Sequence, residues 1–344
     1  MLFSEVQPTL NLYNCFIVPV WKAPIYNSPK QNFKRGMYAM STATLLIEPL
    51  NHFTNHVKIL NQFYEWPKTR SEYNIFFKEV FRLPEFWPEL AKKISFGLLA
   101  GGADVGVKLA AWQWIYGGTY SPQDYADSNT FKHLTCAIVA FAPTCMTGIP
   151  FENARRAYFA DRTWPVELRR GYSSPLNALL RIPFEEGPSY LFKGGFPIYT
   201  SSFLFWTTFC TVYSFNKNKF FFLWVYNDFN YDFIKAGNMA LSFGIASFLG
   251  YPLYFTREMV DLWPKERGGH CTWNNSYRNC AKWMIENMDQ LYFNFMTGYT
   301  RWLKRVGIQY FIALWMADNL GMFSNCNEAW ASLEYQSPIS SEST

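Results

Sequence analysis

Long stretches without charged residues set the hydrophobic pattern of this chain. Residues 194–216 and 236–256 contain no Asp, Glu, Lys or Arg, and residues 134–153 contain one, Glu152, near their end. Because a helix of ~20 residues crosses a bilayer core, each stretch is long enough, or nearly so, to span a membrane. The pattern therefore predicts three transmembrane helices.

Three further apolar stretches, residues 36–60, 94–116 and 299–320, are interrupted by charges. A charge within a membrane span usually faces a cavity or a protein partner rather than lipid. We interpret all three as spans because they complete a threefold repeat of the chain. The interrupting residues include Glu48, Asp104, Lys108, Arg301, Lys304, Arg305 and Asp318.

The repeat is marked by Pro49, Pro150 and Pro252, which lie 101 and 102 residues apart and each close an apolar stretch. A fixed period indicates structural units that bury a core only together. We therefore predict an all-α transmembrane fold, a six-helix bundle of three pseudo-threefold repeats. The expected boundaries are an N-terminal flank (1–32), repeats at 33–130, 131–231 and 232–324, and a C-terminal tail (325–344).

Polar segments separate the two spans of each repeat. They cover residues 71–90, 171–195 and 276–298, and each contains apolar residues at the i, i+3, i+4 spacing of a short amphipathic helix. A helix of this kind lies on a membrane surface instead of crossing it. Each repeat is therefore predicted to consist of a span, a surface helix and a second span.

Composition agrees with a membrane protein. Aromatic residues make up 20% of the chain and charged residues 17%, which suits helices with aromatic belts at the lipid headgroups. The net charge of +5 weakly favours an anionic surface or solute. The seven cysteines include no CxxC pair, so we expect them to be reduced or buried. The first residues lack a cleavable leader pattern, so if the protein enters an organelle, its address is expected within the chain.

The motifs at two places identify a family. Residues 150–155 read PFENAR and residues 186–194 read EGPSYLFKG. This pair resembles the mitochondrial carrier family, in which Pro-x-acid-x-x-base ends an odd helix and acid-Gly, then aromatic-base-Gly, opens the even helix. The resemblance covers about residues 33–322. It implies the carrier fold with matrix-side surface helices, a multi-pass protein of the mitochondrial inner membrane, and transport by alternating access.

The resemblance also implies a charged gate on the matrix side. Its positions here are Pro49, Asn51, Thr54, Pro150, Glu152, Arg155, Pro252, Tyr254 and Arg257. An acid of one repeat would meet the base of the next, so Glu152–Arg257 is the one full ion pair, while Arg155 faces Asn51 and Tyr254 faces Thr54. The gate at the opposite end is expected to be degraded. In the fourth helix Ser214 stands in place of its acid, and in the sixth helix the motif keeps the acid, Asp318, but has neither the aromatic residue nor the base.

Alignment with the family suggests cavity and lipid sites. The candidate cavity residues are Ser95, Ser201, Ser202, Lys304 and Arg305, which leave the cavity poor in charge; Ser201 and Ser202 are also compatible with simple helix packing. Lys193 and Gly194 open a helix and match the family's site for cardiolipin, or alternatively a helix start with a snorkelling lysine.

Other candidates are weaker. His52 and His56 have metal-ligand spacing but no third ligand, so we expect no metal and no cofactor other than bound cardiolipin. The glycine-rich run from residue 97 to residue 108 lacks the Gly-Lys-Ser/Thr sequence of a phosphate loop. Its glycines are better interpreted as a stripe that lets two helices pack closely.

Two functions remain open on this basis. The first is a non-transporting structural subunit of a large inner-membrane assembly, such as a respiratory-chain complex, with membrane lipids and other subunits as partners. The degraded gates and a cavity poor in charge favour it. The alternative is an antiporter that moves a small anionic metabolite by alternating access. Neither an enzyme nor a nucleic-acid-binding protein is expected.

Overall fold

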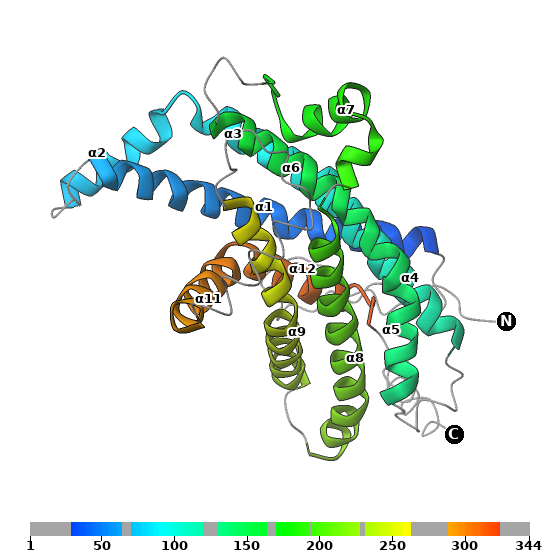
Figure 1. The fold of residues 1–344 in the computed structure, drawn as a ribbon. Coiled ribbons are helices and arrows are strands. Elements are labelled where there is room, and N and C mark those ends of the chain that lie inside the picture. Colours follow the sequence, from blue (N-terminus) through cyan, green and yellow to red (C-terminus); the bar gives the residue numbers. More distant parts are fainter. Residues whose placement is uncertain are drawn as a thin grey trace, which may run out of the picture.

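The computed structural model describes residues 29–63, 70–119, 130–163, 170–192, 194–227, 231–262 and 288–323. Within these residues every regular element is helical, which confirms the predicted all-α class (Figure 1). The elements are α1 (Pro29–Phe63), α2 (Arg70–Arg82), α3 (Phe86–Phe96), η1 (Gly97–Gly101), α4 (Gly102–Thr119), α5 (Thr130–Thr144), η3 (Cys145–Thr147), α6 (Gly148–Thr163), α7 (Pro175–Glu185), η5 (Pro188–Phe192), α8 (Phe196–Asn227), α9 (Tyr231–Leu262), α11 (Met288–Trp302), η6 (Leu303–Gly307) and α12 (Ile308–Asn319).

The long helices form six continuous helical paths: α1, α3–η1–α4, α5–η3–α6, α8, α9 and α11–η6–α12. These paths pack in the order of the chain and close into a ring. Helix α1 packs on α4, α4 on α5, α5 on α8 and α8 on α9, and α12 contacts both α9 and α1. The helical paths match the six predicted spans in position. The ring therefore agrees with the predicted six-helix bundle.

Apolar character is distributed differently from the prediction. In the described part of the chain, three helical stretches are long and apolar enough to cross a membrane: Phe86–Tyr116, Thr130–Phe159 and Phe233–Phe255. The first includes a span that the sequence showed as interrupted. The uncharged stretch 194–216 is not among them, because it is rich in Ser and Thr.

The first surface helix is shorter than predicted. The predicted segment 71–90 contains α2, which ends at Arg82, while α3 begins at Phe86 and continues into the second span. Pro84 lies in the turn between them, where its ring disfavours helical geometry in the preceding residue. The second predicted surface segment contains α7 as expected. Of the third, residues 276–287 lie outside the described residues, and residues 288–298 belong to α11.

The glycine stripe packs helix α4 and the preceding π-helical turn η1 against α1, as the sequence indicated. A β-carbon added at Gly106 would lie 2.9 Å from the carbonyl oxygen of Phe33, and one at Gly36 would lie 2.8 Å from Cα of Gly106. A β-carbon at Gly97 would meet the Thr44 methyl group at 2.5 Å. The two backbones thus approach at a distance that glycine alone permits.

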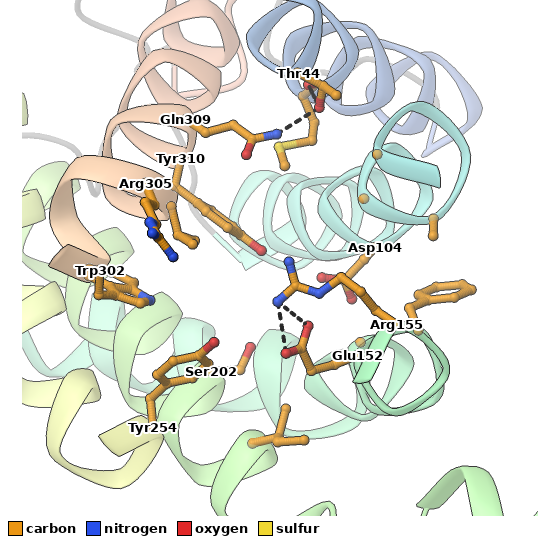
Figure 2. A pocket seen from close by; sticks show the side chains of 18 of the residues that line it. Thr44, Asp104, Glu152, Arg155, Ser202, Tyr254, Trp302, Arg305, Gln309 and Tyr310 are labelled. Atoms are coloured by element: carbon orange, nitrogen blue, oxygen red, sulfur yellow. Dashed lines mark hydrogen bonds and ion pairs between the residues drawn. The ribbon is translucent and has the colours of Figure 1, made fainter. Parts of the chain in front are cut away.

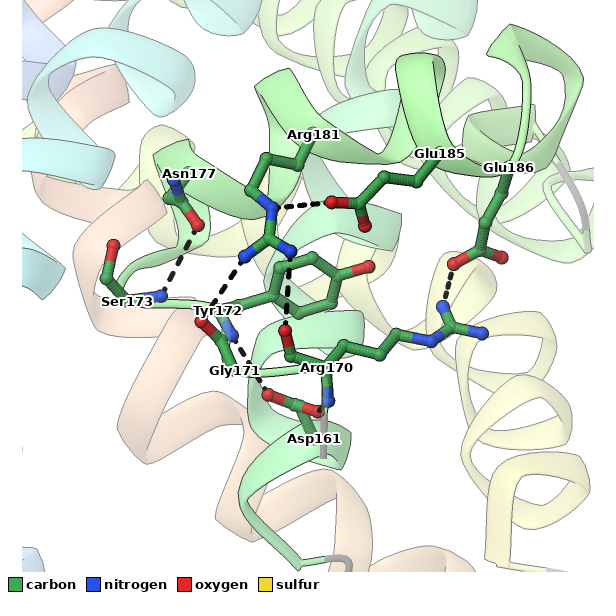
Figure 3. Close-up of polar contacts among 9 residues, drawn as sticks. All are labelled: Asp161, Arg170, Gly171, Tyr172, Ser173, Asn177, Arg181, Glu185 and Glu186. Carbon is green, nitrogen blue, oxygen red and sulfur yellow. Dashed lines mark hydrogen bonds and ion pairs between the residues drawn. The ribbon is translucent and has the colours of Figure 1, made fainter. Parts of the chain in front are cut away.

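Surface helix α7 is anchored to the end of α6 by a polar network (Figure 3). The Asp161 carboxylate accepts hydrogen bonds from the backbone N–H groups of Arg170 (2.5 Å) and Tyr172 (3.1 Å). Ser174 caps α7 by accepting from the N–H of Asn177 at 3.0 Å. The Arg181 guanidinium lies over the Tyr172 ring, 5.3 Å from its centre. These contacts fix the surface helix relative to the cavity wall.

Candidate functional site: a central cavity with two different ends

A cavity of about 400 Å³ lies inside the ring, and all six helical paths line it (Figure 2). Its lining includes Asn51, Glu152 and Tyr254, the three residues at the acid positions of the repeats. We call the end of the bundle where these three lie the proline end. The positions that the motif placed in one gate therefore do meet around one cavity.

The predicted cavity residues divide into two groups. Ser201, Ser202 and Arg305 line the cavity, whereas Ser95 and Lys304 do not. The Ser95 hydroxyl donates to the carbonyl of Ala91 in its own helix at 2.8 Å, and Lys304 is exposed.

Both interpretations of the two serines are correct in part. Ser201 lines the cavity and also donates a hydrogen bond of 2.8 Å to the Gly250 carbonyl on α9. Ser202 lies beside the Cys145 thiol, with 3.6 Å between oxygen and sulfur. The residues thus join helices and face the cavity at once.

The expectation of a charge-poor cavity is wrong. Four cationic and three anionic side chains line it: Lys93, Lys108, Arg155, Arg305, Glu48, Asp104 and Glu152. Several of these were visible in the sequence only as charges that interrupt apolar stretches. Because these charges line the cavity, the interrupted stretches can still span the bundle.

A buried ion pair on α4 lines the cavity. Lys108 pairs with Asp104 one helical turn away on α4, and only 2% of the Lys108 side chain is exposed. The Thr147 hydroxyl donates to the same carboxylate at 2.8 Å, and the Lys108 ammonium lies 5.8 Å from the centre of the Trp206 ring. Helices of the first two repeats are therefore joined here by polar contacts.

Another contact closes the ring between the first and third repeats. The Gln309 side-chain amide on α12 donates to the Thr44 hydroxyl on α1 at 2.8 Å (Figure 2). Thr44 in turn donates to the carbonyl of Met40 at 2.9 Å. No motif of the sequence pointed to this pair, because each residue looks ordinary within its own helix.

At the proline end the gate acid pairs within its own helix. Arg155 and Arg156 each lie 2.9 Å from the Glu152 carboxylate. The predicted partner Arg257 has a side chain outside the described residues, so the Glu152–Arg257 pair stays a prediction. Pro150 lies in the first turn of α6, directly after the 3₁₀ turn η3, whereas Pro49 and Pro252 lie inside continuous helices.

The other two predicted gate contacts differ in the structure. The Asn51 amide donates to the carbonyl of Arg305 at 2.8 Å, and Arg305 donates to Asn55 at 3.0 Å. The exposed Thr54 donates to the Asn51 carbonyl in its own helix at 3.0 Å. Where the first repeat lacks an acid, a neutral amide instead bonds the backbone of the third repeat. Arg155, which was predicted to face Asn51, forms an ion pair with Glu152.

The opposite end of the bundle has a buried ion-pair cluster, which we call the opposite gate, although Ser214 leaves the fourth helix without the acid of the family pattern. Lys217 on α8 lies 2.8 Å from one carboxylate oxygen of Asp318, and Lys235 on α9 lies 2.6 Å from the other. The Asp318 side chain is fully buried. Lys235 and Tyr254 are 19 residues apart on α9, roughly 28 Å at 1.5 Å per residue, which places the two gates at opposite ends.

The sequence motif did not indicate this gate, because the motif requires an acid and a base in the same helix. The structure takes the acid from the sixth helix and the bases from the fourth and fifth. Lys235 was visible as the charge that precedes an apolar stretch, and that was its one signal. A comparison of helix ends across repeats would have found it.

The lipid site at Lys193 and Gly194 stays a prediction, whereas His52, one of the two candidate metal ligands, makes contacts within the protein. Gly194 has a φ of +69°, a left-handed conformation that suits glycine, while Lys193 lies outside the described residues. His52 bonds the Phe86 carbonyl at 2.9 Å and the Lys93 ammonium at 3.1 Å through its two ring nitrogens. Both ring nitrogens of His52 therefore contact protein groups.

Comparison with known proteins agrees with the fold. No family model matches the chain. It is 32% identical over 174 residues to the mitochondrial 2-oxoglutarate/malate carrier protein of Bos taurus, and similarly to that of Mus musculus, with 31% for Homo sapiens. Each match covers 49% of this chain and 54% of the relative, so the chain spans about half the length of the curated relatives it matches. Together with the motif at Pro150 and the all-helical ring, this similarity supports placing the chain in the mitochondrial carrier family, as a divergent member.

Proposed function

We propose that this protein is a solute carrier of the mitochondrial inner membrane that exchanges small anionic metabolites by alternating access. One observation carries the proposal: the cavity has two different ends. Asp318 at the opposite end is completely buried in its ion pairs, whereas 39% of the Arg155 side chain at the proline end is exposed. A cavity closed at one end and accessible at the other is what one state of an alternating-access carrier requires.

The cations of the cavity favour an anionic substrate. Lys93, Arg155 and Arg305 come from the first, second and third repeat, and all three line the cavity. A ligand near the pseudo-threefold axis would thus meet one cation from each repeat. Guanidinium groups suit carboxylates because they donate hydrogen bonds in a planar fork.

We extend the proposal to dicarboxylates. The relatives are named as 2-oxoglutarate/malate carriers, and both compounds carry two carboxylates. Two carboxylates can pair with two cations at once, which matches the spacing of cations over separate repeats. The anionic residues Glu48 and Glu152 would disfavour substrates of higher negative charge.

Exchange of purified protein in liposomes tests this function. Liposomes loaded with malate should take up labelled 2-oxoglutarate, and uptake should require malate inside. Phosphate, nucleotides and monocarboxylates serve as alternative substrates. A folded protein that exchanges none of these compounds would contradict the proposal.

One observation keeps a structural role as the second candidate. Asn51 and Tyr254 replace two acids of the proline-end gate, so two of its three ion pairs cannot form. A chain with a weakened gate would be biased toward one state, as a non-transporting subunit could be. Native gel electrophoresis after mild solubilisation separates the candidates: comigration with a large inner-membrane complex, without exchange activity, supports the structural role.

A further inference from the structure

Arg156 lies next to the gate motif and contacts two repeats. Its guanidinium lies 2.9 Å from the carboxylate of Glu152 on the same helix. The same guanidinium lies over the ring of Tyr254 on α9, 5.6 Å from the ring centre. The side chain is 20% exposed, so water weakens these contacts only in part. One residue therefore connects the gate acid of the second repeat with the gate position of the third.

Tyr254 is well suited to this contact. It stands where the family pattern has an acid, and its aromatic face attracts a cation through the ring quadrupole. The ring lies 6.4 Å from both the Tyr251 and the Trp302 rings, which restrict its orientation. In Figure 2, Tyr254 lies on the cavity wall with Trp302 beside it. Where the family pattern has an acid, this chain thus has a cation–π contact with Arg156.

We propose that Arg156 is a gate residue of this chain: by pairing with Glu152 and stacking on Tyr254, it stabilises the state in which the proline end of the cavity is open. The idea rests on the proposed alternating access for its role in transport. The contact itself does not depend on transport. In this arrangement Arg156 positions the gate and touches no substrate.

The mechanism is a competition for one carboxylate. In the present state Glu152 interacts with two guanidinium groups of its own helix. Closure in the family pattern needs the same carboxylate to turn toward the base position of the next repeat. Every interaction that keeps it on α6 therefore favours the open state. Arg156 adds to this a direct contact between α6 and α9, which closure has to rearrange.

The size of the effect follows from the exposure of the contact. Cation–π contacts range from weak at exposed sites to strong when desolvated, and for this half-buried case we expect about a fivefold change in the ratio of the two states. The state ratio can be read from the accessibility of a thiol inside the cavity. Val306 lines the cavity on η6 and is partly buried, and Val306→Cys changes its volume little.

The experiment measures labelling of the Val306→Cys thiol in proteoliposomes. A membrane-impermeant maleimide is added on the side of the proline end, and protein without this substitution gives the background of the native cysteines. In the protein that carries Val306→Cys, the further substitutions Arg156→Gln and Tyr254→Leu should each slow labelling about fivefold. Tyr254→Phe keeps the aromatic face and should label at the parent rate.

A double substitution shows whether Arg156 and Tyr254 act through their mutual contact or separately. If Arg156 and Tyr254 act through one contact, Arg156→Gln with Tyr254→Leu should slow labelling no more than the larger single effect. Equal rates for Tyr254→Leu and Tyr254→Phe, or fully additive effects of the two substitutions, would overturn the proposal. If Arg156→Gln fails to fold, the comparison of Tyr254→Leu with Tyr254→Phe decides alone.

The labelling result is independent of transport. A chain that exchanges no substrate but shows the expected labelling pattern would refute the proposed function and support the gate residue. A chain that exchanges dicarboxylates with unchanged labelling would do the reverse. The two proposals can therefore fail separately.

Discussion

Lys217 and Asp318 lie 101 positions apart in the chain, one repeat length, and their side chains form an ion pair of 2.8 Å. The lysine ends the uncharged part of α8, and the aspartate lies in the last turn of α12. Because Lys235 on α9 contacts the same carboxylate, a single acid joins three helices at the end of the cavity opposite to the prolines. The Lys217 ammonium also donates to the carbonyl of Phe323 at 3.0 Å.

Replacing this acid should destabilise the closed end strongly. Asp318→Asn leaves two lysines near an uncharged partner, and removing one partner of a buried ion pair costs about 3–5 kcal/mol. We expect a marked fall of the apparent melting temperature in detergent. Arg82→Gln is the control, since it breaks an exposed ion pair of 3.1 Å with Glu79, worth about 0–1 kcal/mol. Equal stability of the two variants would show that the buried pairs contribute nothing.

Neighbouring cations on η6 should differ in their effect on exchange. Arg305 lines the cavity, while the adjacent Lys304 is exposed outside it. A charge-assisted hydrogen bond to a carboxylate is worth about 1.5–3 kcal/mol, so Arg305→Gln should raise the KM for a dicarboxylate roughly 10- to 100-fold. Lys304→Gln should leave it unchanged. The measurement is initial uptake over a range of substrate concentrations, and a similar KM in both variants would exclude Arg305 from the binding site.

This pair also shows what the sequence could and could not predict. The apolar stretches and the proline period predicted the six helical paths, because hydrophobic length and repetition are properties of the chain itself. Which of Lys304 and Arg305 faces inward depends on helical phase. The π-helical turn Leu303–Gly307 contains both residues and changes the helical phase there, and no sequence pattern indicated this turn.

The opposite gate was hidden for another reason. The Lys235–Asp318 pair joins residues from different helices, and a motif search within one helix cannot detect it. The glycine stripe was easier to interpret, since its spacing alone shows that the glycines share one helix face. The close packing of helices, which depends on glycine spacing within one helix, was therefore predicted well, whereas the pairing of Glu152 with Arg155 and Arg156 in its own helix was not. Contacts that depend on how repeats meet required the three-dimensional structure.

The close approach of α1 and α4 predicts a large difference between two identical substitutions. Gly106→Ala would place a β-carbon 2.9 Å from a backbone oxygen of α1, and overpacking of this kind costs about 1–3 kcal/mol. A β-carbon at Gly237, on the open face of α9, meets no atom within 4 Å. Gly237→Ala should therefore be neutral or stabilise the protein by up to about 1 kcal/mol. Thermal unfolding of both variants in the same detergent tests the difference, and a neutral Gly106→Ala would contradict the packing.

Restoring the missing acid of the first repeat should shift the gate toward closure. Asn51 donates a hydrogen bond to the Arg305 carbonyl in the open state, and an aspartate cannot donate, so Asn51→Asp should cost this state about 1–3 kcal/mol. In the closed state the new carboxylate would give Arg155 a partner on another repeat, which adds to the shift. Labelling of the Val306→Cys thiol from the proline end should slow accordingly. Asn51→Ala removes the hydrogen bond without adding charge and should slow labelling less. If the two variants label at the same rate, the carboxylate gains no partner on closure, and the gate of the first repeat has lost its ionic function.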